Sequence, residues 1–468
     1  LMVKLDWEIE SDRVAEHEHQ EDEKERKSRG RKPLRLLLVI LIFLGLITAA
    51  VFLVQQRLRQ ISEWEQELLS QTTEAEVAAL RFGDRQAYMA LQRSASDEWL
   101  ASQSALFDTY QSKKVSSDIQ LTGRVIDVAI DGSRGRVQVE EIEQGTPYIN
   151  TWFYWYYEEE KDEEGRTLVT SGWYHVPPDY TFWGDLATIQ RDPFVVRYHE
   201  LDEPFARQLA DKLSQWTQFA CDIIACGDLP LVTVDVTPNN LPSMRWTTGN
   251  AWQLVVPSPY IHRARHDQPF DQTLQIEAAT LLAERLVEHV VPQPAEYPHD
   301  AFYIRSAVVS WLVGQFVQVN TNTHLVQSIA DNYGTSVVGR LLTELPANAN
   351  MDALAGILGV NDLAAANIDW RDLLSWRLIT EDELISHGDE ANWAALHDFT
   401  DPDVMARSYE RYNANLPPQN YMVTELQPQT SETGAPEVLA IVYVGEDNVF
   451  QEQRILFRLV NNIWLRAS

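Results

Sequence analysis

The sequence predicts an α+β protein anchored by a single transmembrane helix, with two cone-like α+β domains flanking a mainly helical domain. Three observations support this prediction. An uncharged run of 19 residues, 36–54, follows a highly charged N-terminal segment; a short motif recurs far along the chain; and strand-like alternation follows each copy of it. At 468 residues and 45% hydrophobic side chains, the chain is long enough for about three domains of roughly 150 residues.

The uncharged run at 36–54 is expected to cross a lipid bilayer as one helix, because about 1.5 Å per residue nearly spans the roughly 30 Å hydrocarbon layer. A cleaved signal peptide is not expected, since a long charged segment precedes the run. Seven Lys and Arg residues lie just before it, and only Arg57 and Arg59 follow closely. The positive-inside rule therefore predicts a cytoplasmic N-terminus, a transmembrane helix at 34–54 and an extracytoplasmic C-terminal region of a cell-membrane protein.

Residues 1–33 are expected to form a disordered, charged cytoplasmic tail, because acidic and basic blocks alternate there with almost no apolar periodicity. The formal net charge of the chain is −31, and the acidic excess lies mainly after the anchor. Such a surface repels phosphate backbones, so nucleic acid is not an expected partner. Acidity also has a simpler meaning, since it keeps an exposed protein soluble.

The recurring motif occupies residues 83–91 and 388–396, and Gly, Asp, Ala and Leu coincide in the two copies. We expect both copies to open equivalent helices, with the aromatic residues Tyr88 and Trp393 buried against their own sheets. Each copy continues as helix and then changes to strand-like alternation. The predicted strands are 119–130, 136–143, 150–158 and 167–176 after the first copy, and 421–428, 437–445 and 451–466 after the second.

This order of helices and strands, with Gly-Asp opening a helix that covers the sheet, resembles the SnoaL-like or nuclear-transport-factor-like fold. The resemblance implies α+β domains at 55–190, with a helical stalk, and at 377–468. That fold can enclose a pocket, and Trp152, Tyr154 and Trp173 are candidates to line one for an apolar or sugar-like ligand. The alternative is structural packing, since aromatic side chains are favoured in strands. No Asp/His pair in either domain has a spacing that marks an active site.

Residues 191–376 show a second resemblance, in the order of their segments. A helix at 205–226 and strand-like segments at 232–236 and 254–259 precede a helix at 271–291, and a Trp-Leu segment follows at 309–316. This order is similar to that of the peptidase MA-like (gluzincin) domain of bacterial envelope proteins.

The gluzincin resemblance implies a zinc-peptidase scaffold whose metal ligands are replaced. In H-E-x-x-H, two His hold the metal and the Glu polarises a bound water. The matching positions here are Ile276, Glu277 and Thr280, and the third ligand position is Gly314. Neither an alkyl group nor an uncharged hydroxyl replaces an imidazole on zinc. We therefore expect an inactive pseudo-peptidase with Glu277 as a remnant, and no catalytic residue, metal or cofactor.

Two cysteines, Cys221 and Cys226, fall in the predicted outer region, where a disulfide can persist. A disulfide, two buried thiols and a metal site are the alternatives. Their spacing suits a disulfide only if the helix unwinds near Cys226, and Gly227 is the predicted helix cap.

The sequence thus predicts a non-catalytic protein with a binding, scaffolding or regulatory role in the cell envelope, whose partner is an envelope protein, a peptide or a wall component. Two alternatives remain. One is a metallopeptidase with a rebuilt site that uses Glu277 and His residues from elsewhere. The other is a transmembrane signalling protein whose tail contacts a cytoplasmic regulator, as anti-sigma factors do.

Overall fold

The computed structural model describes residues 32–161, 167–261, 263–414, 417–431, 434–446 and 449–468. The chain divides into two units, Leu1–Gln71 and Thr72–Ser468. The predicted tail, residues 1–33, lies almost entirely outside the described residues. The described part is a mixed α+β structure with three larger sheets and a two-stranded one, which confirms the predicted α+β class.

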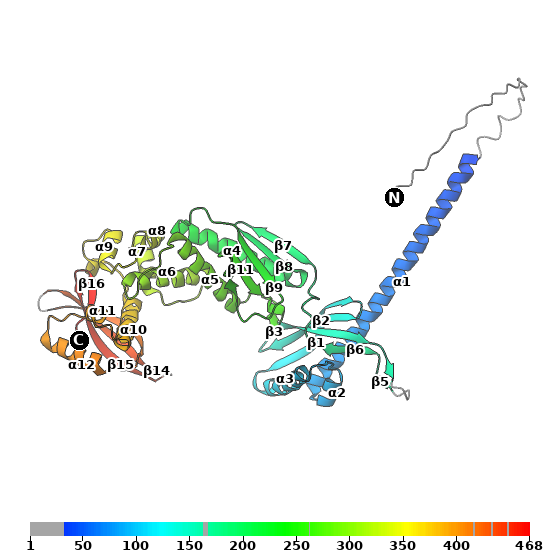
Figure 1. The fold of residues 1–468 in the computed structure, drawn as a ribbon, viewed down its shortest axis with the longest axis horizontal. Coiled ribbons are helices and arrows are strands. Elements are labelled where there is room, and N and C mark those ends of the chain that lie inside the picture. Colours follow the sequence, from blue (N-terminus) through cyan, green and yellow to red (C-terminus); the bar gives the residue numbers. More distant parts are fainter. Residues whose placement is uncertain (1–31, 162–166, 262, 415–416, 432–433, 447–448) are drawn as a thin grey trace, which may run out of the picture. The chain divides into compact units, whose positions relative to one another are not determined.

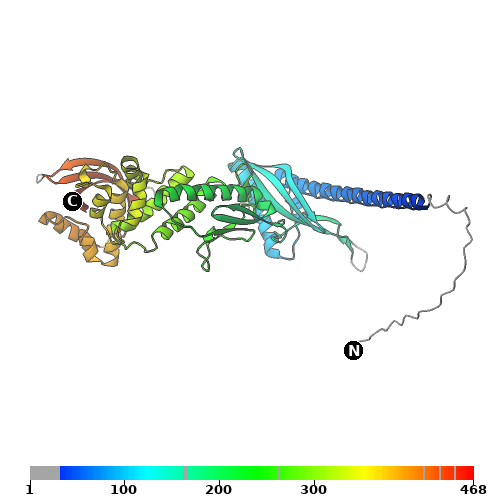
Figure 2. The same ribbon diagram turned by 90° about the horizontal axis from the view of Figure 1, so that it is seen from above.

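Helix α1 runs from Lys32 to Phe82, so it contains the whole predicted anchor and ends inside the second unit. Figures 1 and 2 show it as one continuous helix. Many of the side chains at 32–47 lie outside the described residues. In the described part of the chain, no helix qualifies as a membrane span by length and hydropathy together.

The first sheet is antiparallel and is centred on strand β3, which pairs with β2, β6 and β12. Its strands are Ile119–Asp131 (β1), Arg134–Glu143 (β2), Thr146–Tyr157 (β3), Gly172–Val176 (β6) and Arg263–Arg265 (β12). Three of the four predicted strands are confirmed. The fourth, 167–176, is wrong as a single strand, because Thr167–Val169 (β5) pairs with Glu160–Lys161 (β4) whereas β6 pairs with β3.

Both copies of the repeated motif begin a short helix with an aspartate cap, as predicted. The Oδ1 atom of Asp84 accepts a hydrogen bond from the Ala87 N–H at 3.0 Å. At the matching position, Asp389 accepts one from the Asn392 N–H at 3.2 Å. Each carboxylate satisfies an N–H group that has no partner within its helix. The helices are Arg85–Ala90 (α2) and Glu390–Ala394 (α11).

The glycine and the aromatic residue of the motif also behave alike in the two copies. Gly83 and Gly388 have φ values of +75° and +70°, in the left-handed region that favours glycine. Tyr88 is 1% exposed and Trp393 is fully buried. The prediction that both aromatic side chains are buried is therefore confirmed. In the first copy, helix α3 (Asp97–Ser116) follows and packs on β1.

The third sheet is an antiparallel meander in the order β13-β14-β15-β16. Its strands are Asn420–Thr430, Pro436–Glu446, Val449–Val460 and Ile463–Arg466, and helices Arg371–His387 (α10) and Pro402–Ala414 (α12) precede them. The predicted single strand 451–466 is wrong, because the chain reverses at Asn461 and Asn462. Their φ values are +51° and +60°, and two successive residues with positive φ form a tight hairpin turn.

The second sheet, whose strands fall between β6 and β13 in the sequence, is mixed. Its order is β10-β11-β9-β8-β7, and β8, β9 and β11 are parallel. Its strands are Leu186–Arg191 (β7), Phe194–His199 (β8), Val232–Thr237 (β9), Arg245–Trp246 (β10) and Gln253–Pro257 (β11). The β7–β8 hairpin joins residues on both sides of the predicted boundary at 190. Helix α4 (Glu203–Ile224) connects β8 to β9 and packs on the sheet.

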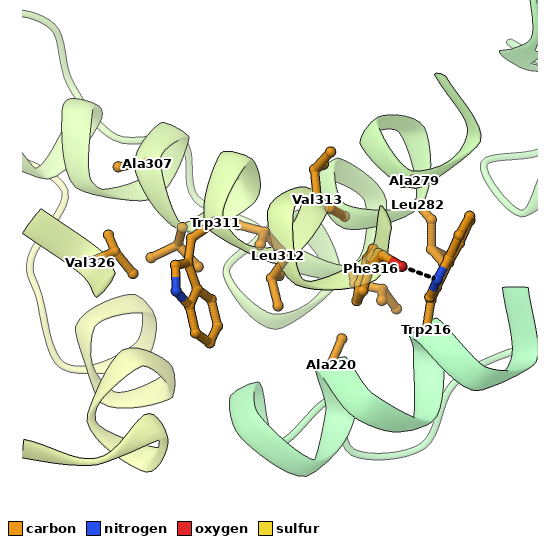
Figure 3. Close-up of a cluster of buried hydrophobic side chains, with 14 of the residues drawn as sticks. Trp216, Ala220, Ala279, Leu282, Ala307, Trp311, Leu312, Val313, Phe316 and Val326 are labelled. Atoms are coloured by element: carbon orange, nitrogen blue, oxygen red, sulfur yellow. Dashed lines mark hydrogen bonds between the residues drawn. The ribbon is translucent and has the colours of Figure 1, made fainter. Parts of the chain in front are cut away.

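Five further helices lie in the segment 191–376, which the sequence predicted to be gluzincin-like. They are Gln272–Val290 (α5), Asp300–Val317 (α6), His324–Tyr333 (α7), Thr335–Thr343 (α8) and Asp352–Leu358 (α9). Figure 3 shows how α4 and α6 meet: the Trp216 indole N–H donates a hydrogen bond to the Phe316 carbonyl at 2.9 Å. The same hydrophobic core continues from Phe153 in the first sheet to Phe457 in the third.

Cys221 and Cys226 form a disulfide, so the first of the three alternatives is the one observed. Helix α4 ends at Ile224, and Ala225 adopts a left-handed conformation with φ of +53°. The helix therefore unwinds just before Cys226, and the prediction of Gly227 as its cap is wrong. This unwinding allows two cysteines five positions apart to meet.

Candidate functional site

Glu277, the predicted remnant of the metal-site motif, lies on α5 and is bound to the backbone. Its Oε1 atom accepts a hydrogen bond from the Met244 N–H at 2.7 Å. The Ile276 side chain is 38% exposed. The hydroxyl of Thr280 donates to the Ile276 carbonyl of the same helix at 2.8 Å. One carboxylate oxygen of Glu277 and the hydroxyl of Thr280 therefore bind the protein's own backbone.

The third predicted position, Gly314 on α6, faces the segment that follows its helix. A Cβ atom there would lie 2.9 Å from the Thr321 hydroxyl and 3.1 Å from the Val319 carbonyl. A glutamate would therefore need a shift of this segment. A cavity of about 190 Å³ beside Gly314 is lined by residues of α6, α7 and the segment between them, and by none of Ile276, Glu277 and Thr280. Within the described ranges, no cluster of three or more His, Cys, Asp or Glu side chains is placed to hold a metal ion.

The three aromatic candidates of the first sheet lie on one face of it, and two of them, Trp152 and Tyr154, contact a buried polar cluster. Tyr154 is fully buried, and its hydroxyl donates to Glu76 Oε2 at 2.9 Å. Trp152 stacks on His175 with ring centroids 5.5 Å apart. Trp173 is 4% exposed and contacts Tyr156. Five well-formed cavities of the described residues are lined by none of Trp152, Tyr154 and Trp173.

Glu76 and His175 form the centre of this buried cluster, which the sequence did not reveal. His175 Nδ1 lies 2.7 Å from Glu76 Oε1, and the Gln92 side-chain amide donates to the same oxygen at 2.8 Å. Burial, reinforced by the Glu76 charge, raises the pKa of Tyr154 well above its ordinary value. The carboxylate is thus surrounded by donors inside the core, which favours a structural role.

The third sheet has an equivalent cluster around Glu381, which precedes Gly388 by the same number of positions as Glu76 precedes Gly83. Glu381 Oε1 lies 3.2 Å from His397 Nε2. Its Oε2 atom accepts from Arg466 at 2.9 Å, and Arg411 also pairs with it. Backbone bridges join Gln92 to His175 in one domain and His397 to Arg466 in the other. In both regions, a buried glutamate thus precedes the motif glycine by the same number of positions.

A further buried carboxylate, Asp202, connects the middle sheet to its loops. It ends a 3₁₀ helix, Glu200–Asp202, and is fully buried. Its oxygens accept hydrogen bonds from the Trp183 indole, at 3.0 Å, and from the Ser258 hydroxyl. Burial raises the pKa of Asp202 to about 6, although these two donors act in the opposite direction. Its partners are structural, so we assign it no chemistry.

A cavity of about 770 Å³ lies between α7, the segment 364–371 and strands β13 and β14. Its polar groups largely satisfy one another. Arg371 binds Asp369 at 2.7 Å and donates to the Thr424 carbonyl at 3.3 Å. The Asn332 amide donates to the Asn367 carbonyl at 2.8 Å. None of these contacts pairs a nucleophile with a base.

A smaller cavity, about 380 Å³, lies on the opposite face of the first sheet from Tyr154. It is lined by Arg93, Ser94, Ala95, Trp155, Tyr157, Val176, Pro177, Pro178 and Asp179. Two of these residues, Trp155 and Tyr157, lie on the same strand as the predicted pocket residues Trp152 and Tyr154. They alternate with Trp152 and Tyr154 along β3, so they point to the other face.

Comparisons of the chain with family models, curated proteins and solved structures give no match.

Proposed function

We propose that this chain is a membrane-anchored, extracytoplasmic binding protein whose gluzincin-like segment, 191–376, is not catalytic. The observation that carries the proposal is the hydrogen bond from the Met244 N–H to Glu277. A carboxylate committed to a backbone donor in this way acts as a structural acceptor. The tight surroundings of Gly314 agree with this, because they leave little room for a third ligand.

The two flanking domains, 55–190 and 377–468, are proposed to be copies of one SnoaL-like or nuclear-transport-factor-like fold. Support comes from the matched caps, glycines and buried glutamates described above. Such an arrangement gives a protein three sheets, and the Glu–His pairs of the described residues are buried in the core, which suits binding or scaffolding. An envelope protein, a peptide or a wall component remains the proposed partner.

Membrane anchoring through residues 36–54 is supported by the exposure of apolar side chains all round helix α1. The consecutive residues Val51, Phe52, Leu53 and Val54 are between 50% and 65% exposed. Four consecutive positions cover every side of a helix, and a helix that is apolar on all sides needs an apolar environment. The flanking positive charges give the proposed orientation.

Protease treatment tests this topology. In cells whose outer surface is accessible, protease is expected to degrade the region after Gln55 and to leave a protected fragment of roughly 55 residues that carries an N-terminal epitope tag. Permeabilised cells serve as the control, because there the tag should also be lost. Loss of the tag in intact cells, with survival of the C-terminal region, would contradict the proposed orientation.

Replacement of the remnant carboxylate tests the non-catalytic assignment. The full-length protein is expected to contain no stoichiometric zinc and to leave a fluorescent casein substrate uncut. Glu277→Gln keeps an oxygen acceptor for Met244, so the free energy of unfolding should change by less than about 0.5 kcal/mol. Glu284→Gln, an exposed position on the same helix, is the matched control. One zinc per chain, together with casein cleavage that Glu277→Gln abolishes, would establish an active peptidase.

A further inference from the structure

The cavity beside Trp155 combines an exposed aromatic ring with Arg93, whose guanidinium has no ion-pair or hydrogen-bond partner among the described residues. Among the described residues, only two tryptophans are exposed, Trp64 on α1 and Trp155 on β3. Trp155 is 44% exposed and is the one of the two that lines a cavity. Its strand neighbours hold it in place, since Arg134 and Tyr174 pair with it on either side.

Arg93 is held beside this ring without an ion pair. Its guanidinium lies 4.0 Å from the centre of the Tyr157 ring and 5.6 Å from that of Tyr174. Tyr157 and Tyr174 are themselves in edge contact at 5.6 Å. No hydrogen bond or ion pair joins the Arg93 guanidinium to any other described residue. Stacking therefore fixes the orientation of the guanidinium and leaves its N–H donors free for a ligand.

The cavity also offers a fixed acceptor. Asp179 accepts hydrogen bonds from the Thr181 N–H at 3.0 Å and the Thr181 hydroxyl at 2.6 Å, and from Arg134 at 3.3 Å. Burial tends to raise the pKa of Asp179, but these donors outweigh it and lower the pKa below its ordinary value. The carboxylate is therefore charged at neutral pH, and its side chain is 24% exposed. It can accept hydrogen bonds from ligand hydroxyls.

We propose that the cavity formed by Arg93, Trp155 and Asp179 binds an anionic saccharide, whose sugar ring stacks on Trp155 while its carboxylate or phosphate pairs with Arg93. The C–H face of a sugar ring is apolar and weakly positive, which suits the negative face of an indole. A guanidinium forms paired hydrogen bonds with a carboxylate or a phosphate. On a protein of net charge −31, an unpaired arginine provides the local attraction that an anionic ligand requires.

This inference rests on the binding role proposed above and gives it a ligand class. The experiment measures binding to the full-length protein in detergent micelles by titration calorimetry. The probes are a hyaluronan tetrasaccharide, which carries carboxylates, glucose 6-phosphate, which carries a phosphate, and neutral chitotetraose. Inorganic phosphate is included to measure the contribution of the anion alone.

At least one of the two anionic sugars is expected to bind, and at least tenfold more tightly than chitotetraose and inorganic phosphate. Arg93→Gln and Trp155→Ala should each weaken this binding at least tenfold, which corresponds to about 1.4 kcal/mol. Arg93→Lys and Trp155→Phe should retain part of it, and they show that a loss is not caused by misfolding. Arg207→Gln and Trp64→Ala, which change exposed residues of the same types elsewhere, should have no effect.

Three outcomes would overturn the proposal. They are binding of neither anionic sugar, binding of chitotetraose or inorganic phosphate as tight as that of the anionic sugars, and anionic-sugar binding that survives both Arg93→Gln and Trp155→Ala. None of these outcomes affects the zinc and Glu277→Gln measurements on helix α5. A failure of the ligand class is thus distinguishable from a failure of the non-catalytic assignment.

Discussion

Glu381→Gln is expected to lower the free energy of unfolding of the C-terminal domain by about 3 to 5 kcal/mol. The substitution removes the negative charge of a buried carboxylate that pairs with two arginines. Glu381 is 3% exposed. Both Arg411 and Arg466 pair with it, and His397 lies 3.2 Å away. The variant would leave two guanidinium groups in the core with reduced compensation. A charge that loses its partner inside a protein costs more than the pair contributes.

The pH dependence of this effect has a definite sign. Burial acts to raise the pKa of Glu381, but Arg466, His397 and Arg411 outweigh it and hold the pKa at about 2. A carboxyl whose pKa is depressed by folding stabilises the native state above its unfolded pKa of about 4.3, and this contribution is lost as the pH falls toward 2. The difference in stability between the wild type and Glu381→Gln should therefore be largest near pH 7 and smaller at pH 3.

Urea denaturation at the two pH values measures the effect of Glu381→Gln. Glu425→Gln serves as the control, because Glu425 is exposed on β13 of the same domain. It should change the stability by less than about 0.5 kcal/mol. Equal stabilities of the wild type and Glu381→Gln at pH 7 would show that the buried cluster contributes nothing to the domain.

Trp393→Ala is expected to cost about 3 to 5 kcal/mol, and Tyr88→Ala a similar amount in the first domain. Trp393 is fully buried, and its ring lies 4.6 Å from that of Tyr412 and 5.0 Å from that of Tyr409. Tyr88 has one close ring neighbour, Phe107, at 5.5 Å. Removal of either ring leaves a cavity that the surrounding helix and sheet can fill only in part.

Trp393→Phe gives this experiment a graded comparison. The indole N–H of Trp393 is buried and has no hydrogen-bond partner among the described residues, so phenylalanine removes an unsatisfied donor as well as some packing. It should cost clearly less than alanine. Phe450→Ala, at a side chain that is 49% exposed, is the surface control. Thermal denaturation that ranks Trp393→Ala beside the surface control would contradict the assigned packing.

Local signals in the sequence predicted the repeated helix starts well, because capping and a left-handed glycine depend on neighbouring residues. The Gly-Asp pairs at 83 and 388 are such signals. The hairpin within 451–466 also had a local signal, the adjacent Asn461 and Asn462, and the prediction overlooked it. The break between β5 and β6 had none, because it depends on which strand each segment pairs with.

The polar clusters and the cavity beside Trp155 depend on contacts between distant residues. Glu76 and His175 are 99 positions apart and meet only because β6 pairs with β3. The signal that the sequence offered for this cluster is Glu76, an acidic residue on the buried side of a helix. The sequence predicted a pocket lined by Trp152 and Tyr154 of β3, together with Trp173. Which face of the strand stays open depends on which face the core covers. The observed cavity is lined by Trp155 and Tyr157, on the opposite face from Trp152 and Tyr154.

The strand β12 sets an order of assembly for the first domain. Arg263–Arg265 pairs with Tyr148–Asn150 of β3, and the Arg263 side chain lies 2.6 Å from Glu141 and 2.5 Å from Glu143. Synthesis proceeds from the N-terminus, so this edge of β3 stays open while more than a hundred further residues emerge. The first domain therefore gains this edge strand only after residues 263–265 have been synthesised. The positive charge of Arg263, which pairs with Glu141 and Glu143, becomes available to the first domain at the same stage.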